Sequence, residues 1–105
     1  MAFAGPARRG AVKGDVMTVY VDNWRQPARI GRLSARWSHL TADSPAELHT
    51  FAACLGLRRA WYQDKGHRWH YDVTESKRRQ AITLGARPIG WREMSELVTA
   101  RRELR

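Results

Sequence analysis

The sequence is nearly free of cysteine, with Cys54 alone among 105 residues. A disulfide framework within one chain is therefore excluded, and so is a cysteine-rich zinc site. No run approaches the roughly 20 apolar residues of a membrane span. Arg8 and Arg9 are not followed by the apolar segment of a secretory signal. These absences predict a cytoplasmic protein in a reducing compartment.

Acidic residues are also scarce, since 10 Asp and Glu oppose 19 Lys and Arg, for a formal net charge of +9. Sixteen of the basic residues are arginines, which bind phosphate and carboxylate groups bidentately. The excess favours anionic partners such as nucleic acid or nucleotides. The alternative is a general basic surface that serves only solubility.

Residues 1–16 are rich in Gly, Ala and Arg and have no hydrophobic period, so we expect a flexible basic leader. Ordered structure is expected from Met17, which is itself a candidate natural start. Residues 17–105 are enough for one domain. The 43% of hydrophobic residues favours a folded core over disorder.

Apolar runs and alternation predict strands at residues 17–22, 33–40, 69–73 and 86–89, with 23–32 as a loop. The best-defined helix is expected at 45–55, because Ser44, Pro45 and Glu47 form a capping-box pattern.

Two further helices follow along the chain. One begins after Thr74 and stops at Gly85, and the other covers about 92–103. The order β-β-α-β-α-β-α predicts a small single α/β domain, with helices packed on a partly parallel sheet of about four strands.

Several polar residues fall near the predicted strand ends, where ligands of α/β sheets gather. Asp22 ends the first strand, His39 ends the second, and Asp43 follows it. His70 and Asp72 lie two apart on the third strand and so share a face. These side chains offer nitrogen and oxygen ligands for a divalent ion that activates water.

A metal-dependent hydrolase or nuclease would use His39, Asp43, His70 and Asp72 as its catalytic set. In the alternative interpretation, Asp72 only orients its neighbours and His39 is a hydrogen-bonded boundary residue.

Phosphate binding is a second hypothesis for the same region. The helix after Thr74 offers free N–H groups at its N-terminus, and Arg78 lies one turn in. The alternative is an ion pair between Arg78 and Asp72 on a solvated helix face.

Cations and rings alternate between residues 58 and 69, a mixture suited to single-stranded nucleic acid. The residues are Arg58, Arg59, Trp61, Tyr62, Lys65, Arg68 and Trp69. The alternative is that Trp61 and Trp69 anchor the core. His49, beside the apolar stripe of the first helix, either points into the ligand pocket or is a half-buried structural histidine.

Five segments together resemble domain-of-unknown-function family 4031, whose members are small bacterial and phage domains. They are Met17-Thr-Val-Tyr-Val-Asp22, His39-Leu-x-x-Asp43, Glu47-Leu-His49-x-Phe-Ala52, His70-Tyr-Asp72 and Gly85-Ala86. The resemblance covers about residues 17–91 and leaves the leader and the third helix outside. It implies no activity, only that His39, Asp43, Glu47, His49, His70, Tyr71 and Asp72 matter as a set.

The leading hypothesis from the sequence is a basic binding domain for nucleic acid or a phosphorylated ligand. Its expected ligand-binding residues are His49, Tyr71, Arg78, Arg58 and Arg59. The alternatives are the metal-dependent hydrolase or nuclease, and a phage or bacterial accessory protein that acts through protein contacts.

Overall fold

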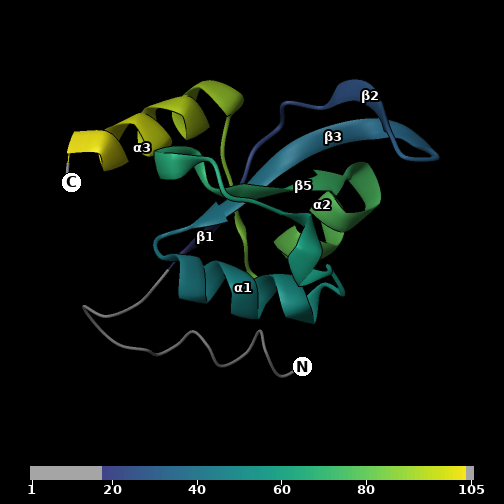
Figure 1. Ribbon diagram of the computed structural model, residues 1–105, viewed down its shortest axis with the longest axis horizontal. Helices are drawn as coiled ribbons and strands as arrows, with labels where there is room; N and C mark the ends of the chain where they lie inside the picture. Colours follow the sequence, from purple (N-terminus) through teal and green to yellow (C-terminus); the bar gives the residue numbers. More distant parts are fainter. Residues whose placement is uncertain (1–17, 104–105) are drawn as a thin grey trace.

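The computed structural model describes residues 18–103 of the chain (Figure 1). A six-stranded mixed sheet carries three helices, which confirms the predicted α/β class with more strands than expected. The strand order is β4-β5-β3-β1-β6, and β2 pairs with β3 outside this path. The leader expected at 1–16 and the candidate start at Met17 lie outside the described residues.

The strands are β1 (Val19–Val21), β2 (Gln26–Ile30), β3 (Leu33–Ala42), β4 (Tyr62–Gln63), β5 (His70–Thr74) and β6 (Arg87–Pro88). β1 and β6 run parallel, whereas β3 is antiparallel to β1, β2 and β5. The expectation of a partly parallel sheet therefore holds for one pair, and the centre of the sheet is antiparallel.

The prediction of a loop over residues 23–32 is wrong, because residues 26–30 form β2 in a hairpin with β3. Every residue of β2 is exposed, so no alternation of buried and exposed residues marks it in the sequence. Pro27 is tolerated because β2 is an edge strand. Gly31, with φ of +62°, supplies the turn between β2 and β3.

The helices are α1 (Pro45–Cys54), α2 (Glu75–Thr83) and α3 (Trp91–Glu103), with short 3₁₀ turns η1 (Arg59–Trp61) and η2 (Gly66–Arg68). The predicted caps are present: the Ser44 hydroxyl accepts from the Glu47 N–H at 3.2 Å and that of Thr74 from the Lys77 N–H at 3.3 Å. Within residues 18–103, no helix is long and apolar enough to span a membrane.

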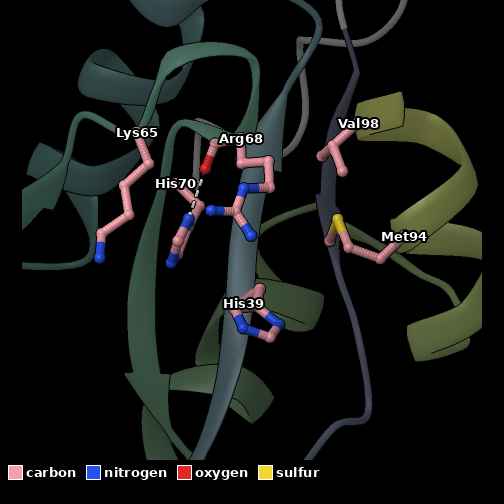
Figure 2. Close-up of a pocket in the computed structure, with 6 residues that line it drawn as sticks. All are labelled: His39, Lys65, Arg68, His70, Met94 and Val98. Atoms are coloured by element: carbon pink, nitrogen blue, oxygen red, sulfur yellow. Dashed lines mark hydrogen bonds between the residues drawn. The ribbon is translucent and has the colours of Figure 1, made fainter. Parts of the chain in front are cut away.

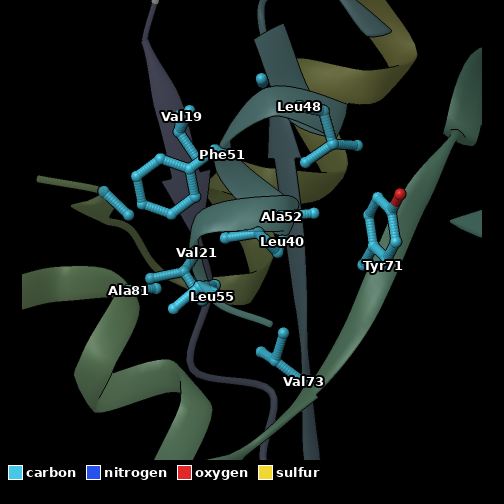
Figure 3. Close-up of a cluster of buried hydrophobic side chains, with 12 residues drawn as sticks. Val19, Val21, Leu40, Leu48, Phe51, Ala52, Leu55, Tyr71, Val73 and Ala81 are labelled. Carbon is cyan, nitrogen blue, oxygen red and sulfur yellow. The ribbon is translucent and has the colours of Figure 1, made fainter. Parts of the chain in front are cut away.

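The core lies between the sheet and the pair α1 and α2 (Figure 3). In this core, alternate residues of the strands pack against the apolar stripe predicted for α1. The buried members are Val19, Val21, Leu40, Ala42, Leu48, Phe51, Ala52, Leu55, Tyr71, Val73, Ala81 and Ala86. Helix α3 covers the opposite face of the sheet (Figure 1). Intervening strand residues, including His39, His70 and Asp72, therefore face α3.

Candidate metal centre

Three polar side chains form a row across the middle of the sheet. In the antiparallel register His39 of β3 pairs directly with Asp72 of β5. On the other side of β3, the Asp22 N–H donates to the His39 carbonyl at 3.0 Å. Because cross-strand neighbours on one face lie about 5 Å apart, the register alone brings these three residues together. His70 joins them two residues before Asp72.

Asp22 is hydrogen-bonded to one nitrogen of the His39 ring and so orients the ring. The Asp22 side chain is 1% exposed, and its Oδ2 lies 2.6 Å from His39 Nδ1. Its Oδ1 accepts the backbone N–H groups of His39 at 2.9 Å and Trp24 at 3.1 Å. A carboxylate only accepts, so in the neutral His39 ring Nδ1 carries the hydrogen and Nε2 has the free lone pair.

His70 is oriented in the same way by a backbone group. Its Nδ1 lies 2.6 Å from the Arg68 carbonyl oxygen, which can only accept. In the neutral ring Nε2 is therefore the bare nitrogen, and it faces Asp72 Oδ1 at 3.2 Å. Two acceptors at this distance are stable only with a cation between them, either a second proton on His70 or a metal ion.

His39, His70 and Asp72 each offer a ligand atom, and these atoms lie within 4.8 Å of one another. Metal-binding histidines typically donate their other ring N–H to a carboxylate or a carbonyl, which is the arrangement of both rings here. Two imidazoles and one carboxylate suit Zn²⁺, Mn²⁺ or Fe²⁺ and leave positions open for water or substrate.

The charges of the cluster are coupled. Burial by itself lowers the pKa of His39, but the hydrogen bond and charge of Asp22, with the charge of Asp72, outweigh burial and raise it. Burial by itself raises the pKa of Asp72, yet the hydrogen bond that it accepts from His70 and nearby positive charges hold it below the ordinary value. Both directions indicate a site that favours an anionic Asp72 with positive charge beside it.

A pocket of about 240 Å³ opens over the two histidines. Figure 2 shows His39 and His70 facing it from the sheet, with Met94 and Val98 of α3 opposite. The remaining lining residues are the cations Lys65 and Arg68. The pocket thus combines candidate metal ligands, two positive side chains and an apolar wall.

A family model described as "Protein of unknown function (DUF4031)" matches residues 19–101, which is most of the chain. The chain belongs to this family. The suspected DUF4031 resemblance is confirmed, but the match extends into α3, so the expectation that the third helix lies outside it is wrong. Searches of curated proteins and of solved structures found no match.

Asp43 is separated from the other candidate ligands of the DUF4031 domain. It follows the end of β3, about 13 Å along the strand from His39. Its carboxylate accepts the Thr18 N–H and the Tyr20 hydroxyl, each at 2.9 Å. The hydrogen bond and charge of Asp43 add to burial in raising the pKa of Tyr20. Asp43 therefore ties β1 to β3 at the far end of the sheet.

Arg78 lies behind the centre and is not a free ligand-binding group. Its side chain is 11% exposed, its Nε donates to the Asp22 carbonyl at 2.8 Å, and Nη1 lies 3.7 Å from Glu75. The sequence left open a pair with Asp72, but Asp72 pairs with His70. Arg78 therefore helps to hold Asp22, the residue that orients the His39 ring, in place.

His49 and Tyr71 lie on the α1 face of the sheet, away from the pocket. His49 Nδ1 is hydrogen-bonded to the Tyr71 hydroxyl at 2.9 Å, and its ring packs on Tyr62. Tyr71 points into the core beside α1 (Figure 3). Alternation along β5 separates them from the cluster, because Tyr71 lies between His70 and Asp72.

The segment from 58 to 69 is divided between surface and core. Trp61 is 48% exposed under the Arg58 guanidinium, so it is not a core anchor. Trp69 packs against the core and is covered by Arg101 at 3.7 Å. The exposed Arg59 lies in the same η1 turn as Trp61, which contacts α1. Arg58 and Arg59 thus do not line the pocket over His39 and His70.

Asp22, Lys65 and Arg68 lie at the site but were not in the catalytic or ligand-binding sets expected from the sequence, which mentioned Asp22 only as a strand-end residue and the two cations only in the segment from 58 to 69. Asp22 carried a usable signal, because it directly follows a buried strand. Lys65 and Arg68 carried none specific to the site, since they reach the pocket only through η2 and its packing against α3.

Proposed function

We propose that this DUF4031 domain is a divalent-metal-dependent hydrolase of phosphate esters. His39, His70 and Asp72 hold the ion, and Asp22 and the Arg68 carbonyl orient the two rings. The observation that carries the proposal is that each ring has Nδ1 engaged by an oxygen acceptor while Nε2 remains for a ligand.

The neighbouring cations define the substrate class. Lys65 and Arg68 line the pocket beside both histidines and can bind the non-bridging oxygens of a phosphate group. The phosphorylated ligand expected from the sequence is retained, with Lys65 and Arg68 in place of Arg78. Met94 and Val98 exclude water from one side, which strengthens these electrostatic contacts. A divalent ion would supply Lewis acidity toward a phosphoryl oxygen and lower the pKa of water.

The test combines metal content with hydrolysis of a chromogenic phosphodiester. Untagged protein is loaded with Zn²⁺, Mn²⁺ or Fe²⁺, freed of excess ion and measured by mass spectrometry, then assayed with and without EDTA. We expect one ion per chain, and hydrolysis that EDTA abolishes and the ion restores. His70→Ala and Asp72→Asn should lose the ion and at least about a hundredfold in rate.

Asp43→Asn is the matched control, because it removes a carboxylate that lies outside the cluster. It should keep both the ion and the rate. Stoichiometric metal in His70→Ala, or hydrolysis that is indifferent to EDTA, would show that the three residues are not the metal centre of a hydrolase.

A further inference from the structure

The β2–β3 hairpin extends from the sheet as a two-stranded ribbon (Figure 1). All five residues of β2 are exposed. Near its tip Ile30 is 49% and Leu33 is 51% exposed. A two-stranded ribbon that packs on no core is only marginally stable in water. Within residues 18–103 no element covers β2, and an exposed apolar tip of this kind is typical of a contact surface.

Every charged residue of the ribbon is basic. Residues 23–37 include four arginines and no acidic residue; they are Arg25, Arg29, Arg32 and Arg36. Arg25 is paired with Glu75 at 3.3 Å. Arg29 and Arg36 donate to backbone carbonyls of the hairpin, Gly31 and Arg25 respectively. Such bonds hold the guanidinium groups in place without neutralising their charge.

One face of the ribbon continues directly into the metal centre. The positions of Leu33, Trp37 and His39 differ by even numbers along β3, so these residues share a face. Arg36, and Arg29 paired with Ser34, lie on the other face of the ribbon. Six residues of strand span about 20 Å, which is the distance from Leu33 to His39 along β3. Trp24 lies between ribbon and site, 40% exposed, with its ring centroid 4.8 Å from that of His39.

From this arrangement we infer that the hairpin is a nucleic-acid-binding arm, with arginines on one face and with Trp24 and Trp37 on the side that continues into the metal centre. Arg29, Arg32 and Arg36 bind backbone phosphates, and Trp24 offers an aromatic surface for a base beside the reacting phosphate. The binding role stands without the hydrolase, whereas the role of polynucleotide as substrate rests on the proposed function.

A polynucleotide fits the ribbon better than other anions. It repeats negative charge along its length, which matches cations spread along an arm about 20 Å long. A two-stranded ribbon fits the major groove of a duplex, and an exposed tryptophan beside arginines suits a single strand. Both forms share the phosphodiester chemistry of the proposed reaction.

The experiment is a fluorescence-anisotropy titration of labelled 20-nucleotide DNA and RNA, single-stranded and duplex, at several salt concentrations with EDTA present. The hairpin variant Arg29→Gln/Arg32→Gln/Arg36→Gln is compared with Arg87→Gln/Arg92→Gln/Arg102→Gln. The second variant loses the same charge at exposed positions outside the arm. Circular dichroism and thermal melts establish that both variants are folded.

We expect the hairpin variant to bind at least about tenfold more weakly at low salt, with the slope of log K against log salt reduced in magnitude by about 2 for single strands and about 3 for duplexes. The control should change affinity by less than about threefold. Trp24→Leu should weaken single-strand binding by about tenfold. If the wild type does not bind, or if both triple variants lose affinity equally, the hairpin is not a nucleic-acid-binding arm.

The two proposals fail in distinguishable ways. Because EDTA is present, a missing metal centre leaves these titrations unchanged and appears only as absent hydrolysis. In metal-loaded wild-type protein we expect oligonucleotide cleavage, reduced about tenfold or more in the hairpin variant at sub-saturating protein. Hydrolysis of the chromogenic diester without cleavage of any oligonucleotide would overturn the substrate assignment.

Discussion

Replacing Asp22 with asparagine should weaken metal binding while leaving the fold in place. The carboxylate is fully buried and makes three hydrogen bonds: from the backbone N–H groups of Trp24 and His39, and from His39 Nδ1. An asparagine in the same rotamer keeps the first two through its oxygen. Its NH₂ group then faces His39 Nδ1 and donates to it.

This exchange reverses the tautomer of the ring. With Nδ1 as acceptor, the neutral His39 ring carries its hydrogen on Nε2, the nitrogen that the site needs bare. Loss of such an outer partner typically costs 10–100-fold in metal affinity, or about 1.4–2.7 kcal/mol. Because the number of hydrogen bonds is conserved, we expect the free energy of unfolding to change by less than about 2 kcal/mol.

The assay is competition of the wild type, Asp22→Asn and Asp43→Asn against a chromophoric chelator for Zn²⁺ or Co²⁺, with urea unfolding in parallel. NMR titration of the metal-free protein adds a second readout, because the pKa of His39 is raised by Asp22 against the effect of burial. It should fall in Asp22→Asn. Wild-type metal affinity in a folded Asp22→Asn protein would refute the reasoning that Asp22 selects the ligand nitrogen.

Three further predictions address the rest of the domain. Leu48→Ala, at a core position with 0% exposure, should lower the free energy of unfolding, measured by urea denaturation, by about 2–5 kcal/mol. A decrease of less than about 1 kcal/mol would show that Leu48 is not in a tightly packed core. Burial and then the charge of Arg59 lower the pKa of His49 below 6.5, so its contribution to stability decreases as the pH falls through that value. Arg59→Gln should raise this pKa in an NMR titration, and an unchanged value would exclude Arg59 as a cause. Arg101 lies over Trp69 and donates to the Ala42 carbonyl at 2.6 Å, so Arg101→Met should destabilise α3 by about 1–3 kcal/mol, seen as faster amide exchange in that helix but not in α1.

Elements with their own local signals could be predicted from the sequence. Helix α1 has a capping serine, a proline at the first position and an apolar stripe, and its bounds were predicted within one residue. Thr74 and Gly85 mark α2 in the same way, and Gly85 adopts φ of +114° after the helix. Each of these signals acts within a few residues, so no tertiary contact is needed to interpret it.

Strands whose position depends on pairing with another strand could not be predicted from the sequence. β2 carries no alternation because neither of its faces is buried, and β4 (Tyr62–Gln63) is too short to have a pattern. Strand direction also has no local signal. β3 lies between β1 and β5 and is antiparallel to both, which only the assembled sheet determines.

Strand direction also explains why the structure brings together only part of the predicted set of site residues. The sequence argument placed ligands at strand ends, a rule for parallel sheets, and so grouped Asp43 with His39. In the antiparallel sheet Asp22, just beyond the end of β1, meets His39 within β3, while Asp43 lies beside Thr18 at the opposite end. His70 and Asp72 joined His39 because spacing by two and a shared register act regardless of direction. The same arrangement of strands makes Asp22, rather than Asp43, the carboxylate that lies 2.6 Å from His39 Nδ1.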